Sequence, residues 1–351
     1  TRHFSEEFKR RLLASFDDLD EQCDGLLIHS ENFQALSLLL ERYRASVNAI
    51  YIDPPYNSPA SEIPYKNDYK HSSWLALMHD RLLRSVAYLV DDASYAIAID
   101  DYEQAVLCAL LDVLFPQMDR QLVIVNHHPQ GGMSHNISRT HEYMAILVPS
   151  GLDVLRGKEK TSGVEYRSFM LSGPGTNKTR SGRPNSFYAV LVDRKARKVV
   201  GVEPPPKGAK YPTGPTEDGY ERIYPINQTG EEKVWCRTFE SARSLVAQGA
   251  IVLTDQGTLK IAIDTTGRRR SLMSNWTDSR YNAGPHGTAL IADILGGRDC
   301  FAYPKSLFTV MDAIEAMTWF AEEPSILDFF AGSGTTGHAV INLNRDRKSV
   351  V

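Results

Sequence analysis

The feature that most constrains this chain is an apolar run over residues 47–52 that leads directly into Asp53, Pro54, Pro55 and Tyr56. The β-branched residues of the run predict a buried strand, and the two prolines must end it because proline has no N–H to give to a sheet. A residue before a proline avoids helical backbone angles, so Asp53 is expected to be extended. Asp53 is therefore predicted at the carboxyl end of a strand, the edge where open α/β sheets bind ligands.

This arrangement suits methyl transfer to the exocyclic nitrogen of a nucleobase. Such an amine is a poor nucleophile until acceptors hold its N–H bonds, and the Asp53 carboxylate and the Pro54 carbonyl are acceptors of this kind. The contact strengthens as positive charge grows on nitrogen, so it favours the transition state. Tyr56 could stack on a base that has been flipped out of a duplex. The alternative is an ordinary strand-to-loop turn in which Asp53 is only a cap.

A second apolar strand, over 325–327, ends in Asp328 and leads through a glycine-rich turn into a helix. Gly332 and Gly334 let the backbone approach a ligand closely, and the helix start offers free N–H groups. No lysine follows the glycines, which excludes a phosphate-binding P-loop. Taken alone, the turn could be purely structural. Its occurrence in one chain with the first motif is what makes the pair informative.

Residues 51–57 and 328–336 resemble the catalytic and cofactor motifs of S-adenosylmethionine-dependent DNA amino-methyltransferases. The catalytic motif comes first and the cofactor motif last, which resembles the circularly permuted β class, and within it the modification (Mod) subunits of type III restriction–modification systems. Residues 27–36 are similar to a further family segment, with Ser30-Glu31 in place of Gly-Asp, and residues 301–306 resemble its Pro-Lys-Ser/Pro motif.

The resemblance implies an α/β fold: a Rossmann-like methyltransferase with permuted motif order and an inserted α+β target-recognition domain. The expected ranges are 1–150 for the catalytic half, 151–282 for the insert and 283–351 for the cofactor half. It also implies adenine N6 as the target, because Asp precedes Pro-Pro-Tyr where the cytosine-N4 enzymes usually have Ser.

The candidate site residues fall into three groups by expected role. The catalytic group is Asp53, Pro54, Pro55 and Tyr56. The cofactor group, for S-adenosylmethionine, is Asp328, Phe330, Gly332, Gly334, Thr335, Lys305, Ser306 and Glu31. The substrate group is Asn57, His127, His128, Arg139, Arg268 and Arg269. In the family, the strand that corresponds to the end of this sequence finishes in an acidic residue that grips the ribose hydroxyls of the cofactor. No such residue is found here up to Val351, and Asp346, which precedes the apolar end, is a poor substitute.

The charge distribution favours double-stranded DNA as a partner, although the net charge is −4. Residues 151–210 carry 13 Lys and Arg against 5 Asp and Glu, so the rest of the chain is strongly acidic. A basic segment of this kind predicts a phosphate-binding face, or else a solvated loop in which basic residues cluster by chance.

Metal chemistry and disulfides are not expected. His127, His128 and His135 lack a Cys or carboxylate at ligand spacing, and Asp100-Asp101 are adjacent on a strand and so point opposite ways. The four cysteines, Cys23, Cys108, Cys236 and Cys300, form no Cys-x-x-Cys pair. With no signal-peptide pattern and no transmembrane-length run, these features predict a cytoplasmic, nucleoid-associated prokaryotic protein with reduced thiols.

Two other functions remain open from the sequence. One is methylation of a different planar amine or amide: cytosine N4, RNA or a protein glutamine. The other is a DNA-binding subunit that keeps the fold but turns over weakly. The family resemblance further allows a homodimer or a helicase-nuclease restriction subunit as partner, with no role for a membrane.

Overall fold

The computed structural model describes residues 4–18, 22–58, 71–131, 136–160, 163–297 and 301–348. The chain divides into two compact units, Thr1–Lys158 with Arg269–Val351, and Glu159–Arg268. The middle unit therefore begins later and ends earlier than the expected range of 151–282. The reason is packing: Val154 and Trp276, which lie inside that range, belong to the hydrophobic core of the first unit.

The first unit is built on a six-stranded sheet of order β13-β3-β4-β2-β1-β14. The pairs β1–β14, β1–β2 and β13–β3 are parallel, whereas β4 is antiparallel to both of its neighbours. The fold is thus mixed α/β with a mainly parallel sheet. In sheet order the strands are β13 (Asn275–Trp276), β3 (Met118–Val125), β4 (Glu142–Pro149), β2 (Leu89–Ile99), β1 (Val47–Ile52) and β14 (Ile326–Leu327).

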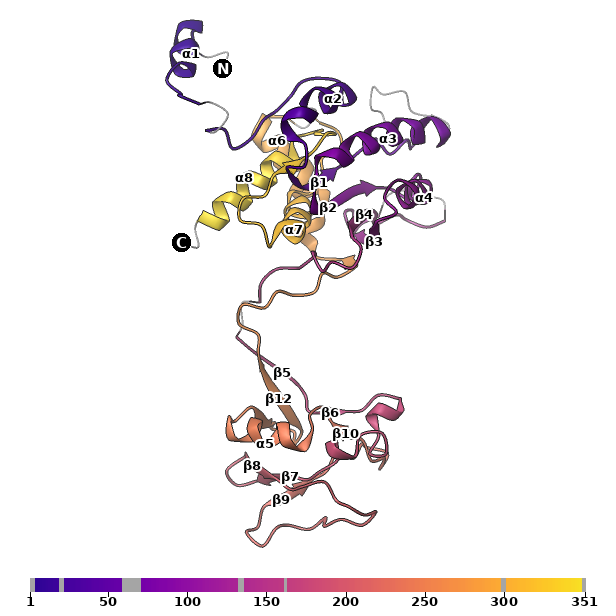
Figure 1. Cartoon of the computed structure of the whole chain (residues 1–351), viewed down its shortest axis with the longest axis vertical. Coiled ribbons are helices and arrows are strands. Elements are labelled where there is room, and N and C mark those ends of the chain that lie inside the picture. The colour runs from indigo at the N-terminus through magenta and orange to yellow at the C-terminus, as the bar shows by residue number, and fades with distance from the viewer. Residues whose placement is uncertain are drawn as a thin grey trace. The chain divides into compact units, whose positions relative to one another are not determined.

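Helices cover both faces of this sheet (Figure 1). Because side chains alternate along a strand, Ile50 and Ile52 of β1 face one layer, and Ala49 and Tyr51 face the other. The first layer holds α2 (Asn32–Tyr43), α3 (His71–Ser85) and α4 (Gln104–Leu114), and the second holds α7 (Leu307–Thr318) and α8 (Thr335–Lys348).

The topology brings distant residues to one edge of the sheet. Parallel pairing of Ile50 with Leu327 places the ends of β1 and β14, and therefore Asp53 and Asp328, at the same edge. Strand β4 runs the opposite way, so its first residue, Glu142, lies where the parallel strands end, paired with Val125 at the end of β3. One edge thus collects side chains from the start, the middle and the end of the chain.

The second unit has its own core, in which Phe169, Tyr188 and Trp235 are buried together with aliphatic residues. Three small antiparallel sheets and one helix surround this core, so the unit is α+β. Its elements are β5 (Val164–Ser168), β6 (Met170–Leu171), η2 (Thr176–Lys178), η3 (Pro184–Ser186), β7 (Val190–Asp193), β8 (Lys198–Val202), β9 (Glu221–Ile223), β10 (Val234–Trp235), α5 (Phe239–Ala247), β11 (Ile251–Leu253) and β12 (Leu259–Asp264).

The remaining elements of the first unit are short helices. They are α1 (Glu6–Leu13), η1 (Val86–Tyr88), η4 (Ser279–Tyr281), the π-helix η5 (Gly284–Ala289) and α6 (Leu290–Leu295). None of the helices in the described part of the chain has the length and apolarity that a membrane crossing requires.

Candidate active site

Four side chains converge at the end of β1. The ammonium nitrogen Nζ of Lys305 lies 3.2 Å from Oδ1 of Asp53 and 2.8 Å from Oε2 of Glu142, and it also contacts the hydroxyl of Tyr56. The Tyr56 hydroxyl in turn donates a 3.0 Å hydrogen bond to Oε2 of Glu142. Two of the four predicted catalytic residues, Asp53 and Tyr56, are therefore joined by a lysine that was predicted for the cofactor and by a glutamate that was not predicted at all.

Burial sets the protonation of this cluster. It raises the pKa of Asp53, while the neighbouring Lys305 opposes that rise. Burial alone would lower the pKa of Lys305, but the carboxylates of Asp53 and Glu142 outweigh it and raise that pKa. Burial also works against the charge on Glu142, yet Lys305 and His127 hold its pKa below the ordinary value. The cluster is thus one ammonium shared by two carboxylates, of which Glu142 holds its charge more firmly.

Two hydrogen bonds fix the loop that follows Asp53. Nε1 of Trp74 donates a 2.7 Å hydrogen bond to the Pro55 carbonyl, and Nδ2 of Asn57 donates a 2.7 Å bond to Oε1 of the fully buried Glu103. Asn57 has a positive φ of 57°, in the left-handed region that asparagine tolerates. The substrate contact predicted for Asn57 stays a prediction: the residue is only 2% exposed, and its side chain donates to Glu103 and so anchors the loop.

Two polar groups near the cluster are buried with no hydrogen-bond partner among the described residues. One is the hydroxyl of Tyr51, whose pKa is raised by burial and by Asp53, Glu142 and Asp328. The other is Nδ1 of His127, whose pKa is lowered by burial. Buried polar groups are normally paired, so an unpaired one beside a site indicates a place for a ligand.

The glycine turn is shaped by Asp328. Its Oδ1 accepts a 2.8 Å bond from the Phe330 backbone N–H, and its Oδ2 accepts a 2.6 Å bond from the Thr336 hydroxyl. Burial raises the pKa of Asp328 to about 6, against the effect of those two donors. Gly332 and Gly334 both have positive φ, 52° and 77°, so the turn needs residues without a Cβ.

Of the other predicted cofactor residues, Phe330 and Thr335 belong to this turn. Thr335 begins α8, and its hydroxyl is 2.8 Å from that of Ser333. Asn32, which the sequence did not single out, ties the amino-terminal segment to the turn, since its Nδ2 donates a 3.0 Å bond to the Phe329 carbonyl. Glu31 is exposed, caps α2 and pairs with Arg81.

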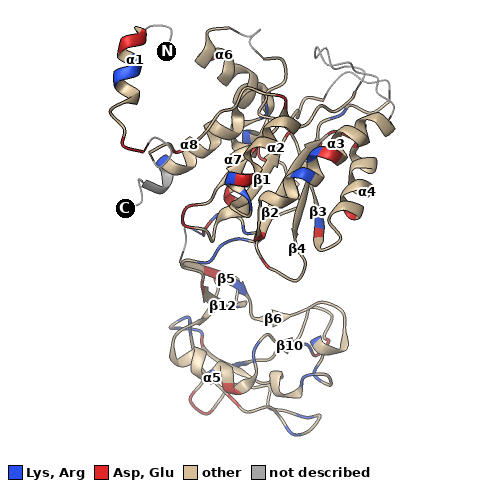
Figure 2. Cartoon of the chain, turned by 45° about the horizontal axis from the view of Figure 1, so that its top comes forward, with Lys and Arg blue, Asp and Glu red and all other residues tan. Residues whose placement is uncertain are grey.

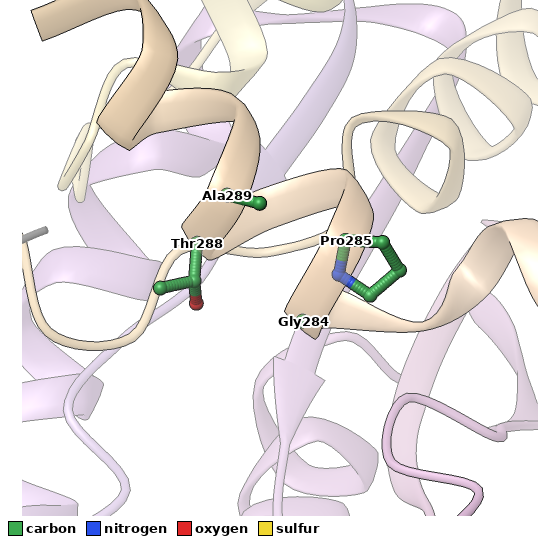
Figure 3. Close-up of a pocket in the computed structure, with 4 residues that line it drawn as sticks. All are labelled: Gly284, Pro285, Thr288 and Ala289. Carbon is green, nitrogen blue, oxygen red and sulfur yellow. The ribbon is translucent and has the colours of Figure 1, made fainter. Parts of the chain in front are cut away.

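The segment that carries Lys305 is held by close backbone packing. A Cβ on Gly287 would lie 2.6 Å from the Pro304 carbonyl oxygen and 2.8 Å from that of Lys305, so η5 presses directly on this segment. Ser306 is buried, and its hydroxyl donates a 2.7 Å bond to the Arg280 carbonyl, which leaves Ser306 engaged within the fold instead of facing a cofactor. Other residues of η5, namely Gly284, Pro285, Thr288 and Ala289, line a hollow of about 400 Å³ (Figure 3).

A family model described as DNA methylase, for N6 and N4 methyltransferases, matches residues 47–347. The match covers most of the chain and includes both strand-end motifs. The chain belongs to this DNA methylase family. As a member it is a DNA methyltransferase, and its methyl donor is S-adenosylmethionine.

This DNA methylase is similar to curated relatives along nearly its whole length. It is 29% identical over 359 residues to the type II methyltransferase M.KpnI of Klebsiella pneumoniae, covering 96% of this chain and 81% of that protein. It is 25% identical to the EcoPI Mod subunit of Escherichia phage P1, with 93% of this chain and 56% of that subunit covered. The chain thus spans most of the first relative and little more than half of the second.

Solved structures similar to the DNA methylase include a complex of M1.HpyAVI with S-adenosylmethionine and a putative DNA modification methylase from Thermus thermophilus. The first is 14% identical with a TM-score of 0.28, covering 38% of this chain and 60% of that chain. The second is 19% identical with a TM-score of 0.26, covering 38% of this chain and 55% of that chain.

The residues at the sheet edge fit S-adenosylmethionine. The glycine turn exposes backbone at Gly332 and Gly334, and space is open where a Cβ of Gly334 would lie. The Phe301 ring lies 3.3 Å from the Cβ position of Gly332, which places an aromatic surface over the turn. The buried Tyr51 hydroxyl, which has no partner among the described residues, provides a polar group that is influenced electrostatically by Asp53 and Asp328.

The predicted substrate residues are dispersed. His128 is exposed and next to His127, and Arg139 is exposed and paired with Asp101 at 3.1 Å. Arg269 lies in the first unit, 3.4 Å from the Gly157 carbonyl oxygen and 3.5 Å from Glu315. Arg268 is exposed and ends the second unit.

The basic segment over 151–210 is partly neutralised, and Figure 2 shows that both signs of charge occur in each unit. Seven of its basic residues pair with carboxylates: Arg156, Lys158, Lys160, Arg167, Arg180, Arg194 and Arg197. Six make no ion pair with any described residue: Lys178, Arg183, Lys195, Lys198, Lys207 and Lys210. The six unpaired residues are the ones available to contact phosphates.

The structure also places the histidine, aspartate and cysteine residues that could suggest a metal site or disulfides. The described segments contain no group of three His, Cys, Asp or Glu side chains that could hold a metal ion. Asp100 follows the last residue of β2, as a strand terminus should, and Cys23, Cys108 and Cys236 are free thiols. His135, Cys300 and the side chain of Asp346 lie outside what the structure describes.

Proposed function

We propose that this chain methylates the N6 amine of adenine in double-stranded DNA at a specific sequence, after the target base is flipped from the duplex. The observation that carries the proposal is the position of Asp53. Its carboxylate follows β1, and the glycine turn follows β14, the parallel neighbour of β1 in the sheet. An acceptor for an amine and a seat for a methyl donor therefore share one edge.

The roles of the site residues follow from their contacts. When bound, S-adenosylmethionine supplies an electrophilic methyl group on a positively charged sulfur. Asp53 accepts an N–H of the adenine amine, which keeps the nitrogen lone pair directed at the methyl carbon and stabilises the positive charge that the nitrogen gains. The Pro54 carbonyl accepts the second N–H, and the ring of Tyr56 stacks on the base. Asp53 also takes the proton that the nitrogen releases.

The cofactor is held by residues at the end of β14 and the start of α8. Backbone N–H groups near Gly332 and Gly334, together with the positive dipole end of α8, would hold the cofactor. Tyr51 would offer its buried hydroxyl as a further polar contact to the cofactor. In this arrangement Glu31 has only a peripheral place, because its carboxylate is exposed and paired with Arg81.

The order of the motifs corresponds to the permuted β class, and the unit Glu159–Arg268 is proposed as the target-recognition domain. Its support is a separate core and exposed, unpaired lysines that suit phosphate contacts. A homodimer, or pairing with a restriction subunit in a prokaryotic cell, remains a proposal of the same kind, since relatives such as the EcoPI Mod subunit are named as subunits.

Long-read mapping of modified bases in DNA from cells that express the chain tests this function. The expected result is N6-methyladenine on one sequence motif, absent from cells that express Asp53→Ala. N4-methylcytosine on a motif would assign the other base. No modified DNA, with methyl transfer to RNA or protein in a tritium assay, would overturn the proposal.

A further inference from the structure

Glu142 is the one acidic residue of the cluster to which neither motif assigns a role. It begins β4, and because β4 is antiparallel its carboxylate reaches the edge where Asp53 lies. The Glu142 side chain is 4% exposed, against 26% for Asp53 and 11% for Lys305. A carboxylate this deeply buried is costly unless charged or hydrogen-bonded partners compensate it.

The contacts of Glu142 are with the partners of Asp53. Its Oε2 accepts from Lys305 at 2.8 Å and from the Tyr56 hydroxyl at 3.0 Å, so a single oxygen holds both groups. The Lys305–Asp53 distance is longer, at 3.2 Å. The ammonium is therefore shared by both carboxylates, with its shorter contact to Glu142.

We propose that Glu142 is a positioning residue of the methyl-transfer site, which retains Lys305 and fixes Tyr56 so that Asp53 stays free to bind the target amine. The inference rests on the proposed function, which supplies the amine. Without the charge of Glu142, Lys305 would pair with Asp53 alone and compete with the amine for its oxygens. The Tyr56 ring would also lose the acceptor that sets its orientation for stacking.

The charges around Asp53 determine in which direction its pKa moves when one of them is removed. Lys305, ahead of α7, favours the charged carboxylate, and Glu142, at the start of β4, disfavours it. The other titratable groups that face this cluster are Tyr56 of the loop, Tyr51 of β1, Asp328 after β14 and His127 after β3. Removing the charge of Glu142 therefore makes Asp53 easier to ionise, whereas removing that of Lys305 makes it harder.

The test compares Glu142→Gln, Lys305→Met and the control Glu315→Gln, using full-length protein and a DNA duplex that contains the methylated motif. Glu315 is on α7 and pairs with Arg269, outside the cluster. Three properties are measured: kcat against pH, the affinity for S-adenosylhomocysteine by calorimetry, and base flipping by the fluorescence of 2-aminopurine at the target position. The last two need no turnover.

For Glu142→Gln we expect kcat to fall at least about tenfold, weaker flipped-base fluorescence, and cofactor-product affinity within about twofold of wild type. The acid limb of its pH profile should move to lower pH, and that of Lys305→Met to higher pH. Glu315→Gln should match the wild type.

Two results would overturn the role of Glu142: an unchanged kcat, or a reduced kcat with the acid limb in its wild-type place, as expected of a purely structural residue. If Glu142→Gln does not fold, Lys305→Met still decides, because an unmoved acid limb there refutes the charge balance. A wild-type protein that methylates no DNA would instead refute the proposed function, so the two failures are distinguishable.

Discussion

Replacing Gly287 by Ala perturbs the position of Lys305 without touching any charged group. The new Cβ would lie 2.6 Å from the Pro304 carbonyl oxygen and 2.8 Å from the Lys305 carbonyl oxygen, whereas real Cβ contacts are essentially never below 3.0 Å. The Pro304 carbonyl must therefore retreat by at least about 0.4 Å, the difference between those distances. Both oxygens belong to rigid backbone, so the strain cannot be relieved by rotating a side chain.

We expect two consequences of Gly287→Ala. Overpacking of this kind costs about 1–3 kcal/mol of stability. A displacement of several tenths of an ångström in the Lys305 segment should also lower kcat by roughly tenfold, since about 1 Å of misplacement costs on the order of a hundredfold. Thermal unfolding and a tritium methyl-transfer assay measure the two effects.

The matched control is Gly284→Ala in the same π-helix. Its Cβ would meet only the end of the Asn282 side chain, at 3.3 Å, and that side chain can move. We expect wild-type kcat from this control. If Gly287→Ala and Gly284→Ala behave alike in both assays, the packing of η5 is not what positions Lys305, and the reasoning is refuted.

Three further predictions concern the loops that frame the site. The pKa of Asp328 is raised to about 6, so the ionised carboxylate destabilises the folded state above that pH, and this penalty is lost as the pH falls. Relative to Asp328→Asn, the wild type should therefore gain about 1 kcal/mol of unfolding free energy between pH 7.5 and pH 5, as measured by urea titration. A difference that stays constant over this range would contradict the prediction. Trp74→Phe should lower the stability by about 1–3 kcal/mol and also lower kcat, because it leaves the Pro55 carbonyl of the catalytic loop unpaired. Trp319→Phe loses a similar bond, to the Val154 carbonyl, and should lower the stability without lowering kcat. Equal kcat values in the two variants would refute the role of Trp74. Gly334→Ala should impose about 1–2 kcal/mol of backbone strain and weaken the binding of S-adenosylhomocysteine, measured by calorimetry. Gly337 has open space around its Cβ position and no positive φ, so Gly337→Ala should bind normally. Equal binding by the two variants would show that the turn tolerates a Cβ.

The sequence predicted the parts of this site that local rules control. The strand over 47–52 ends where the prolines require, and Asp53 lies at the carboxyl edge as expected. Hydrophobic periodicity also predicts helices over 74–88, 103–115 and 307–319 and a β-ladder over 251–263. The structure has α3, α4, α7 and the antiparallel pair β11–β12 close to these ranges. Periodicity and proline rules act over a few residues, so they can be applied to a sequence without knowledge of the fold.

The apolar stretch over 25–29 predicts a short strand, and this prediction is wrong, because the structure has no strand there. Leu26 and Leu27 are 66% and 86% exposed, so this apolar stretch has no neighbouring strand to pair with. An apolar run predicts a strand only if the fold supplies a place for it in a sheet, and that information is not local.

Glu142 shows why part of the site was not predictable. Its two partners, Tyr56 and Lys305, are 86 and 163 residues away in sequence, and they meet it only because β4 is antiparallel in an otherwise parallel neighbourhood. A carboxylate at the head of an apolar strand was the available signal, and it is shared by many solvent-exposed residues. Lys305 was assigned to the cofactor by resemblance, and its contacts with two carboxylates follow from the fold alone.

Nucleoside analysis of DNA treated with purified protein and S-adenosylmethionine, using either the wild type or Asp53→Ala, tests whether Asp53 accepts the adenine amine beside a methyl donor bound at the glycine turn. We expect N6-methyladenine from the wild type. For Asp53→Ala we expect the methylation rate to fall at least about a hundredfold while the affinity for S-adenosylhomocysteine is retained. Methylation by Asp53→Ala at the wild-type rate, or a product other than N6-methyladenine from the wild type, would contradict this expectation.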